Sequence, residues 1–378
     1  MPDLYRIPPL SFDSDLVATL FEIERLRADI GTGDTPRDTF AELQLLFDTV
    51  MSVVSARIEG NHTTVFEALD HAGGEPADAT DEKLREITNI VSAARYLDSL
   101  DPAEPLTHLL IRDLHARTVA GLTTEGDPTP GAYRKVDVAI RGSAHRPPSS
   151  PLVHAEMSSL LDFANAERPL HEQMMQIALA HHRFVWIHPF RNGNGRVSRL
   201  LTYAMLRRTI FATRGFSAVN PTAVFGNDRG AYISALESAD TLSDDGTIAW
   251  ASFFVRGIRD DIARLVRLQD RLHVIEALVG PSLDRLLRDG QVTADEHRVL
   301  HRVLDLGTVK AGDLSDVAPG SASTRSRLIR DLLDRRLLRH SSEGPRFYRL
   351  SISQGPLAPR IIRQLDVLGY LPKMLSED

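Results

Sequence analysis

The 378-residue sequence predicts a mostly α-helical protein with two short β-hairpins. Apolar residues recur every three or four positions along most of the chain, which is the spacing of amphipathic helices. The alternation typical of strands occurs only near 136–140 and 339–350. The chain contains no internal repeat and no low-complexity tract. We therefore expect an all-α core that carries one small hairpin, followed by a C-terminal α+β module.

Composition narrows the class of protein. Hydrophobic residues make up 42% of the chain and charged residues 25%, as in ordinary soluble globular proteins. The net charge of −7 argues against nucleic-acid binding by bulk electrostatics, and the lack of cysteine excludes disulfides and thiolate metal sites. The N-terminus has no basic, apolar leader, and no apolar run approaches the ~20 residues of a membrane span. We expect a cytoplasmic protein that does not bind a membrane.

Residues 1–100 form the first predicted region, which is helical. Three prolines in the first 13 residues favour an extended arm. Ser14 is a plausible N-cap for the first helix, and Gly60 is a plausible stop for the second. A loop rich in Ala, Gly and Asp covers 70–80. Helical spacing predicts the helices of this region at 14–29, 40–57 and 82–100.

Residues 101–275 form the predicted central core. A strand at 136–140, a turn and the return segment 145–148 predict a hairpin. Adjacent His181 and His182 face different directions on a helix and lack the spacing of four that is typical of a zinc pair, so we expect packed histidines there. Helical spacing predicts helices at 107–119, 154–167, 171–187, 200–214 and 248–274, and another that opens at 228–232.

The stretch from His188 to Arg199 contains the candidate catalytic and anion-binding residues. Its sequence is His-Pro-Phe-Arg-Asn-Gly-Asn-Gly-Arg-Val-Ser-Arg. Pro189 should end the preceding helix, and a new helix that begins on Gly-Asn-Gly offers free N–H groups and a positive dipole to an anion. Arg196 and Arg199 lie three apart on its first turn. His188 stands beside them as a proton acceptor. A base next to an anion site indicates transfer of a phosphate-linked group to a hydroxyl.

These residues resemble the signature of the Fic (Fido) family, His-Pro-Phe-x-(Asp/Glu)-Gly-Asn-Gly-Arg-x-x-Arg. Members mostly transfer AMP from ATP to a protein hydroxyl. The resemblance therefore implies ATP as substrate and, as partner, a target protein with an exposed Ser, Thr or Tyr. It implies that His188 takes the proton from the target side chain. The residues that would hold and neutralise the phosphates are Gly193, Asn194, Gly195, Arg196 and Arg199.

One position departs from the signature. The acidic residue that binds Mg²⁺ in the family is Asn192 here. An amide oxygen can bind a hard cation but brings no negative charge, so Asn192 is expected to be a weak metal ligand beside the phosphates. Removal of AMP, or transfer of a different group, stays open as an alternative chemistry for the same site.

The helix predicted at about 40–60 ends in a second motif. From the residues alone, Glu59 is an exposed glutamate at a helix end. Many Fic proteins, however, carry Ser/Thr-x-x-x-Glu-(Gly/Asn) on an inhibitory helix, and Ser55, Glu59 and Gly60 match this pattern. The chain thus resembles the class with an N-terminal inhibitory helix, in which Glu59 would pair with Arg199.

Two further segments resemble parts of the family. The hairpin with Val136, Val138 and Ile140 would be the flap that aligns the target by strand addition, although a plain surface hairpin explains the pattern equally well. Tyr232 follows Asp-Arg-Gly-Ala in a segment that lies near the nucleotide base in the family. A core tyrosine is the competing interpretation.

Residues 285–352 form the predicted C-terminal module. Helices at 293–306, 309–317 and 321–338 and a hairpin at 339–350 resemble a winged helix, a variant of the helix-turn-helix. Residues 321–340 hold six arginines against two aspartates, so DNA binding and a charged interaction surface both remain possible. The alternative function is a DNA-binding regulator whose core only senses nucleotide. The last region, 353–378, should be a helix that packs back or forms a homodimer.

Overall fold

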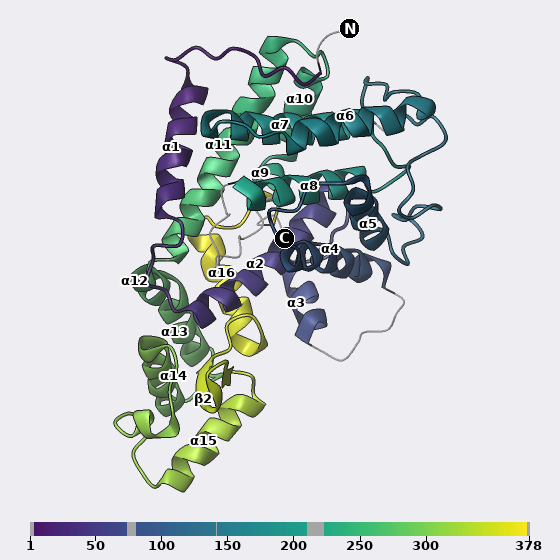
Figure 1. Ribbon diagram of the computed structural model, residues 1–378. Helices are drawn as coiled ribbons and strands as arrows, with labels where there is room; N and C mark the ends of the chain where they lie inside the picture. The colour runs from purple at the N-terminus through teal and green to yellow at the C-terminus, as the bar shows by residue number, and fades with distance from the viewer. Residues whose placement is uncertain (1–3, 74–80, 141, 210–222, 376–378) are drawn as a thin grey trace.

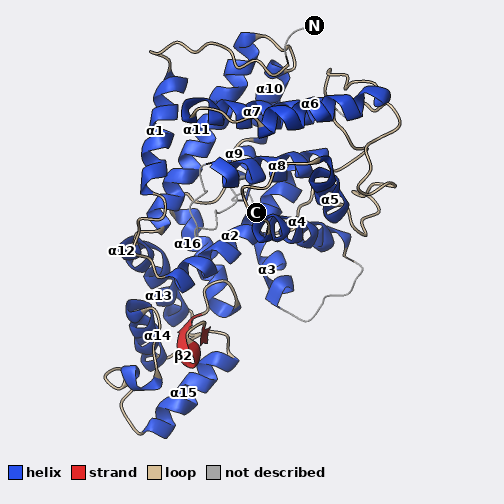
Figure 2. Cartoon of the chain, viewed as in Figure 1, coloured by secondary structure: helices blue, strands red, loops and turns tan. Residues whose placement is uncertain are grey.

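The computed structural model describes residues 4–73, 81–140, 142–209 and 223–375. Nearly all regular structure in these ranges is helical (Figures 1 and 2), as the sequence predicts. The helices before residue 270 are α1 Asp15–Asp29, α2 Arg37–Ile58, α3 Val65–Gly73, α4 Glu82–Ser99, α5 His108–Thr118, α6 Val153–Asn165, α7 Leu170–Ile187, α8 Asn194–Thr209, α9 Ala223–Gly226, α10 Arg229–Ala239 and α11 Asp244–Leu268. Helix α3 overlaps the loop predicted at 70–80, and the remainder of that loop lies outside the described residues.

Side-chain caps explain where several helices begin. The Ser14 hydroxyl accepts a hydrogen bond from Val17 N at 3.3 Å, which confirms its predicted role as the N-cap of α1. Thr107 caps α5 in the same way, and Asp81 caps α4 through two backbone N–H groups. Each cap satisfies donors that have no partner inside the helix.

The helices that flank the signature form the centre of the core. Helices α7 and α8 are buried along most of their length, and α1 runs beside α11 on one side of them (Figure 1). Trp250 of α11 is fully buried and donates its ring N–H to the carbonyl of Ala178 on α7 at 2.7 Å. The two motif helices are therefore fixed by packing on several sides.

Residues 136–140 form no strand, so the predicted hairpin at this place is wrong. The return segment contains Pro147 and Pro148, which cannot donate ladder hydrogen bonds. Side chains hold the loop instead: Arg134 Nη1 donates to Val136 O at 3.0 Å, and Asp137 accepts from Ser150 N at 2.7 Å. Within the described ranges, the one sheet is the antiparallel pair β1 Leu338–Ser341 and β2 Gly344–Leu350, which confirms the second predicted hairpin.

The C-terminal part is a smaller helical module that carries this hairpin (Figure 2). A π-helical turn at Val274–Val279 joins α12 to α13, so the chain is helical from 271 to 288. The helix predicted at 309–317 is wrong, because Val309 pairs with Tyr348 of β2 and only a 3₁₀ turn, Ala311–Leu314, follows. The helices of this part are α12 Arg271–His273, α13 Gly280–Arg288, α14 Ala294–Leu306, α15 Ala322–Asp334 and α16 Ala358–Val367.

The C-terminal residues pack back onto α2, as Figure 1 shows along the middle of the molecule. Buried Glu42 accepts hydrogen bonds from Ser353 N and Oγ, at 3.1 and 2.7 Å, and pairs with Arg339 of β1. At the other end of the helix, Arg57 donates to Met374 O at 2.7 Å. Helix α2 is therefore held at both ends by residues that lie about 300 positions later in the chain.

Helix α2 is also long and apolar enough to cross a membrane by length and composition, alone among the helices of the described ranges. Most of it is buried inside the protein, which is the ordinary condition of a core helix.

Candidate active site

The backbone around His188 is fixed by the end of α7. His188 adopts a left-handed conformation (φ 50°, ψ 61°) that residues with a Cβ rarely take, and its N–H closes the helix on Phe184 O at 3.0 Å. Arg134 then secures the turn from outside. Its Nε donates to His188 O at 2.8 Å and its backbone N–H donates to Pro189 O at 2.9 Å. The cost of the left-handed backbone conformation of His188 is therefore offset by these hydrogen bonds.

The ring of His188 is prepared to act as a base. Its Nδ1 lies 3.3 Å from the carbonyl of Val185, which assigns the proton to Nδ1 and leaves the lone pair on Nε2. Burial, aided by the nearby charge of Arg134, lowers the pKa of His188 to about 4. The imidazole is thus neutral at physiological pH and can accept a proton through Nε2.

The loop after Pro189 is held by two polar side chains. Asp127 accepts hydrogen bonds from Arg191 N and Asn192 N, at 3.1 and 3.3 Å. Asn194, the first residue of α8, folds back and makes two 2.9 Å bonds with the backbone of Phe190. The side chain of Asn194 therefore fixes the shape of the loop. Its backbone N–H is one of the first N–H groups of α8, which have no partner within the helix.

Two glycines, one in this loop and one in the first turn of α8, have close neighbours. Gly193 has φ 77°, and a Cβ there would lie 3.0 Å from Val119. A Cβ on Gly195 would lie only 2.1 Å from Oε1 of Glu59. The carboxylate of Glu59 is thus seated against the first turn of α8, at the anion site that the sequence predicts.

Arg199 binds the end of α2 through three hydrogen bonds. Its Nη2 contacts Glu59 Oε1 at 2.7 Å and Ser55 O at 2.9 Å, and its Nε donates to Ser55 Oγ at 2.8 Å. Burial acts to raise the pKa of Glu59, but the charge and hydrogen bond of Arg199 outweigh it and hold the pKa below its ordinary value. Gly60 follows with φ 105° and ends the helix, as predicted.

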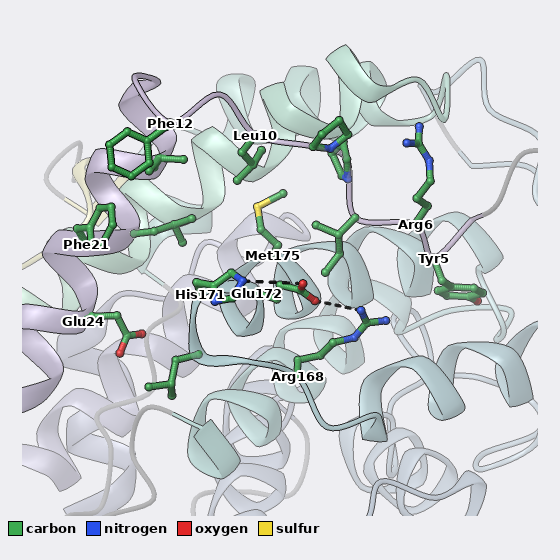
Figure 3. Close-up of a pocket in the computed structure, with 16 residues that line it drawn as sticks. Tyr5, Arg6, Leu10, Phe12, Phe21, Glu24, Arg168, His171, Glu172 and Met175 are labelled. Atoms are coloured by element: carbon green, nitrogen blue, oxygen red, sulfur yellow. Dashed lines mark hydrogen bonds and ion pairs between the residues drawn. The ribbon is translucent and has the colours of Figure 1, made fainter.

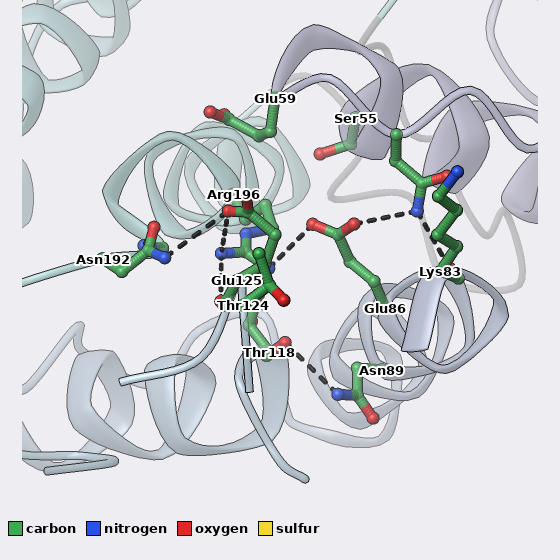
Figure 4. Close-up of polar contacts among 12 residues, drawn as sticks. Ser55, Glu59, Lys83, Glu86, Asn89, Thr118, Thr124, Glu125, Asn192 and Arg196 are labelled. Carbon is green, nitrogen blue, oxygen red and sulfur yellow. Dashed lines mark hydrogen bonds and ion pairs between the residues drawn. The ribbon is translucent and has the colours of Figure 1, made fainter. Parts of the chain in front are cut away.

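Arg196 is engaged elsewhere, as Figure 4 shows. It is 1% exposed, and its Nη1 pairs with Glu86 of α4 at 2.8 Å while its Nη2 donates to Glu125 O at 2.8 Å. Of the two signature arginines, Arg199 makes the contacts at the anion site and Arg196 joins α8 to α4. A phosphate role for Arg196 stays a prediction.

Asn192 faces a carboxylate that the sequence did not reveal. Its Oδ1 accepts from Gly193 N at 2.7 Å, and its Nδ2 lies 3.4 Å from Oε2 of Glu125 (Figure 4). Glu125 is partly exposed at the edge of the site. The amide group of Asn192 and the carboxylate of Glu125 therefore lie side by side, with the amide nitrogen facing the carboxylate, where the signature places its metal-binding acid.

Tyr232 lies in the core. It is 4% exposed, its hydroxyl hydrogen-bonds to His181 Nε2 at 3.0 Å, and its ring centroid lies 5.2 Å from that of Phe225. Burial raises the pKa of Tyr232 to about 12. The structure thus favours the core tyrosine over a ring that is open to a nucleotide base.

The comparisons with known proteins agree with this geometry. Residues 105–206 match the Fic/DOC family. This matched segment, residues 105–206, is called the Fic domain below. The match covers the segment from just before α5 to the end of the signature helix and includes His188, Asn192 and both arginines.

Curated relatives of the Fic domain are named protein adenylyltransferases. A protein adenylyltransferase Fic of Nematostella vectensis is 30% identical over 162 residues, which cover 41% of this chain and 34% of that protein. That of Drosophila willistoni is 34% identical over 161 residues, 41% of this chain and 31% of the relative. A probable protein adenylyltransferase of Aquifex aeolicus is 28% identical over 167 residues, 43% and 48% of the two chains. The match thus spans about a third to a half of these relatives' length.

Solved structures share the fold. A Fic family protein from Desulfovibrio desulfuricans G20 superposes with a TM-score of 0.56 at 19% identity, over 91% of this chain and 98% of that one. A Fic domain containing signaling protein from Bacteroides thetaiotaomicron gives a TM-score of 0.52 at 19% identity, over 68% and 98% of the two chains. At this identity the likeness concerns the fold of the Fic domain and its helical surroundings.

The flap residues of the Fic domain lie in an irregular loop. Val136 is 48% exposed, and Val138 and Ile140 are partly buried. Arg134 joins this loop to His188 through the hydrogen bonds described above. The loop is therefore connected to His188 but lacks the predicted strand, and its role as a flap stays a prediction.

Sequence reasoning missed four residues that organise the Fic domain. They are far from the signature in sequence, so no spacing pattern relates them to it. The four are Glu86, Glu125, Asp127 and Arg134.

A separate cavity of about 720 Å³ lies at the far end of α7 from His188 (Figure 3). The N-terminal arm, α1 and the first turn of α7 line it, with Phe12 and Phe21 at its rim. It contributes no residue to the site around the signature.

Proposed function

We propose that this protein transfers AMP from ATP to a hydroxyl of a target protein, and that Glu59 holds it in an inactive state. The names of the relatives support a transferase of this kind. The observation that carries the proposal is the position of the Glu59 carboxylate, against Gly195 and bonded to Arg199 beside His188. A site that stabilises this anion is built to stabilise a phosphate of ATP.

The proposed reaction uses His188, Arg199 and the backbone at the start of α8, once Glu59 no longer holds Arg199. Nε2 of His188 accepts the proton of the target hydroxyl as its oxygen attacks the α-phosphorus of ATP. A new P–O bond forms, the bond from the α-phosphorus to the bridging oxygen breaks, and pyrophosphate leaves. The backbone N–H groups at the start of α8 and the guanidinium of Arg199 would stabilise the charge on the phosphates.

Inhibition follows from competition for the same donors. While Glu59 and Ser55 bind Arg199, that guanidinium is not available to a phosphate. The carboxylate of Glu59 would also repel a terminal phosphate placed against α8. ATP would then bind in a pose that is unsuitable for transfer.

The residues around Asn192 fit a Mg²⁺ ion. Mg²⁺ commonly uses one or two carboxylates together with substrate phosphates, and Glu125 and the amide oxygen of Asn192 would hold it here. When bound, the ion would supply additional charge neutralisation on the phosphates.

The target would be aligned by the loop with Val136, Val138 and Ile140. This loop has exposed residues at 136, 137 and 139 and is joined to His188 through Arg134. An extended target segment could pair with it and bring its hydroxyl to Nε2 of His188.

The proposal is tested with ATP labelled at either the α- or the γ-phosphate. Transfer of AMP retains the α-label on protein and loses the γ-label, so α-label alone should appear on the full chain or on lysate proteins. His188→Ala should abolish it. Retention of γ-label would instead indicate phosphate transfer, and absence of both labels with every nucleotide tried, even in Glu59→Gly, would contradict the proposal.

A second candidate function belongs to the C-terminal module. Arg327 and Arg330 are exposed on α15, and Arg346 is exposed on β2. A helix and an adjoining hairpin that both expose arginine suit a DNA duplex, as in a winged helix. Fluorescence anisotropy of a labelled duplex should then rise with the full-length protein, fall with added salt, and weaken in Arg327→Ala with Arg330→Ala. Arg298→Ala on α14 is a control, and equal binding by all three proteins would rule out this role.

A further inference from the structure

We propose that α13 and α14 form a binding site for a single zinc ion, with Asp284, His297 and His301 as its protein ligands. The histidines lie four positions apart on α14, which is the spacing that His181 and His182 lack. Asp284 lies on α13 and faces both of them. The site is separate from the Fic domain and independent of the proposed transfer of AMP.

Three ligand atoms already converge. Oδ1 of Asp284 lies 2.8 Å from Nε2 of His297 and 3.2 Å from Nε2 of His301, and all three atoms fall within 4.8 Å of one another. In a tetrahedral zinc site with metal–ligand distances of ~2.0–2.1 Å, neighbouring ligand atoms lie about 3.3 Å apart. Both distances from Asp284 are thus within about 0.5 Å of the separation that a tetrahedral site requires.

The ligands are held on rigid elements. Helix α13 is anchored by buried Leu283 and Leu286, and α14 by buried Val299 and Leu300, which flank the ligands in sequence. Such packing fixes the two helices relative to each other and limits the entropy lost on binding. The histidine rings lie with centroids 4.3 Å apart, on the same face of α14.

The polar environment favours a cation at this point. One carboxylate oxygen, Oδ1 of Asp284, lies within hydrogen-bonding distance of both imidazole rings. Within the described ranges, this is the one group of at least three His, Asp or Glu residues whose ligand atoms converge in this way.

The chemistry of the ligands selects the metal. Imidazole nitrogens suit Zn²⁺ and other late transition metals, whereas Mg²⁺ and Ca²⁺ prefer sites made only of oxygen. Three protein ligands leave one position for water. An ion there would bridge α13 to α14 at the start of the C-terminal module.

The test uses the untagged, full-length protein after treatment with a chelator. Co²⁺ should bind with one equivalent per chain and produce the visible absorption of a four-coordinate site, and one equivalent of Zn²⁺ should remove this absorption. Loss of one ligand should weaken Zn²⁺ binding at least about tenfold, since changes in surrounding residues alone commonly cost that much. Asp284→Asn should therefore bind at least about tenfold more weakly, and His297→Ala with His301→Ala should not bind.

His340→Ala, which removes an exposed histidine of β1, is the matched control and should bind like the wild type. The ligands are partly exposed, so the variants should fold, and circular dichroism without metal should match the wild type. The proposal fails if the wild type binds no Co²⁺, or if the double variant binds as tightly as the wild type.

Discussion

Nη2 of Arg199 lies 2.7 Å from Oε1 of Glu59, although 140 positions separate the two residues in the chain. The contact joins the end of α2 to the signature helix α8. It also places a carboxylate at the predicted anion site, because Oε1 of Glu59 lies only 2.1 Å from where a Cβ on Gly195 would be. In the proposed function this single pair decides whether a phosphate can reach its donors.

Ser55 is expected to help Glu59 hold the guanidinium of Arg199 in place. Its hydroxyl is buried and accepts the Nε–H of Arg199 at 2.8 Å. Ser55→Ala leaves this donor without that partner, so the free energy of unfolding should fall by about 1–3 kcal/mol, and self-labelling with ATP should rise. Urea unfolding and the labelling assay measure the two effects. Ser52→Ala, whose hydroxyl bonds only within its own helix, should not raise labelling; if both variants behave alike, Ser55 has no special role.

The pH dependence should show a base that stays neutral in mild acid. The pKa of His188 is lowered to about 4 by burial, against an ordinary value of 6.5. The rate of the Glu59→Gly variant should therefore not decline around pH 6.5, and protonation of His188 should lower it only near pH 4. Between these values the unfolded chain binds more protons than the folded one, so His188 should make the protein less stable as pH falls from 6.5 to 4. An acidic limb of the pH–rate profile centred near 6.5 would contradict the lowered pKa.

Asn192→Asp should strengthen metal binding. The new carboxylate would lie beside that of Glu125, and two neighbouring negative charges favour a divalent cation between them and the phosphates. Mn²⁺ binding in the presence of ATP, followed by electron paramagnetic resonance, should tighten, and labelling should need less Mg²⁺. Glu125→Gln should weaken binding in the wild-type background. If neither variant changes the affinity for Mn²⁺, the ion is not held here.

The docking of the C-terminal residues on α2 should stabilise the inhibited state. Glu42 is 1% exposed and binds Ser353 and Arg339, so Glu42→Ala leaves buried donors without their acceptor. We expect a loss of roughly 1–3 kcal/mol in unfolding free energy, moderated by the partial exposure of Arg339, and higher self-labelling as α2 loosens. Glu343→Ala on the exposed turn of the hairpin is the control. Unchanged stability in Glu42→Ala would mean that the docking contributes little.

The sequence predicted what depends on local pattern. Helices such as α1, with its cap at Ser14, and the hairpin β1–β2 follow from spacing and capping. The prediction failed at 136–140 and at 309–317. Arg134 holds the first segment through bonds to Val136 O and to the distant His188 O, and Val309 forms a bridge with the distant Tyr348. Local periodicity carries no information about such partners.

In the candidate site, too, local motifs could be predicted from the sequence and long-range contacts could not. His188 and the anion-binding start of α8 could be inferred from the residues of the signature, while the pairing of Glu59 with Arg199 came only from a resemblance. The bond of Arg196 to Glu86, 110 positions away, was not predictable from the sequence. Ion pairs between residues so far apart in the chain produce no recurring spacing of residues in the sequence.

The central claim is that Glu59 holds a competent transferase in an inactive state, and the most direct measurement is self-labelling of the full chain with α-labelled ATP. Glu59→Gly should label more strongly than the wild type, because Arg199 and the start of α8 become free for the phosphates. Glu59→Gly combined with His188→Ala should not label, which shows that the signal depends on the base. Equal labelling of wild type and Glu59→Gly, under conditions in which His188 is required, would contradict the claim.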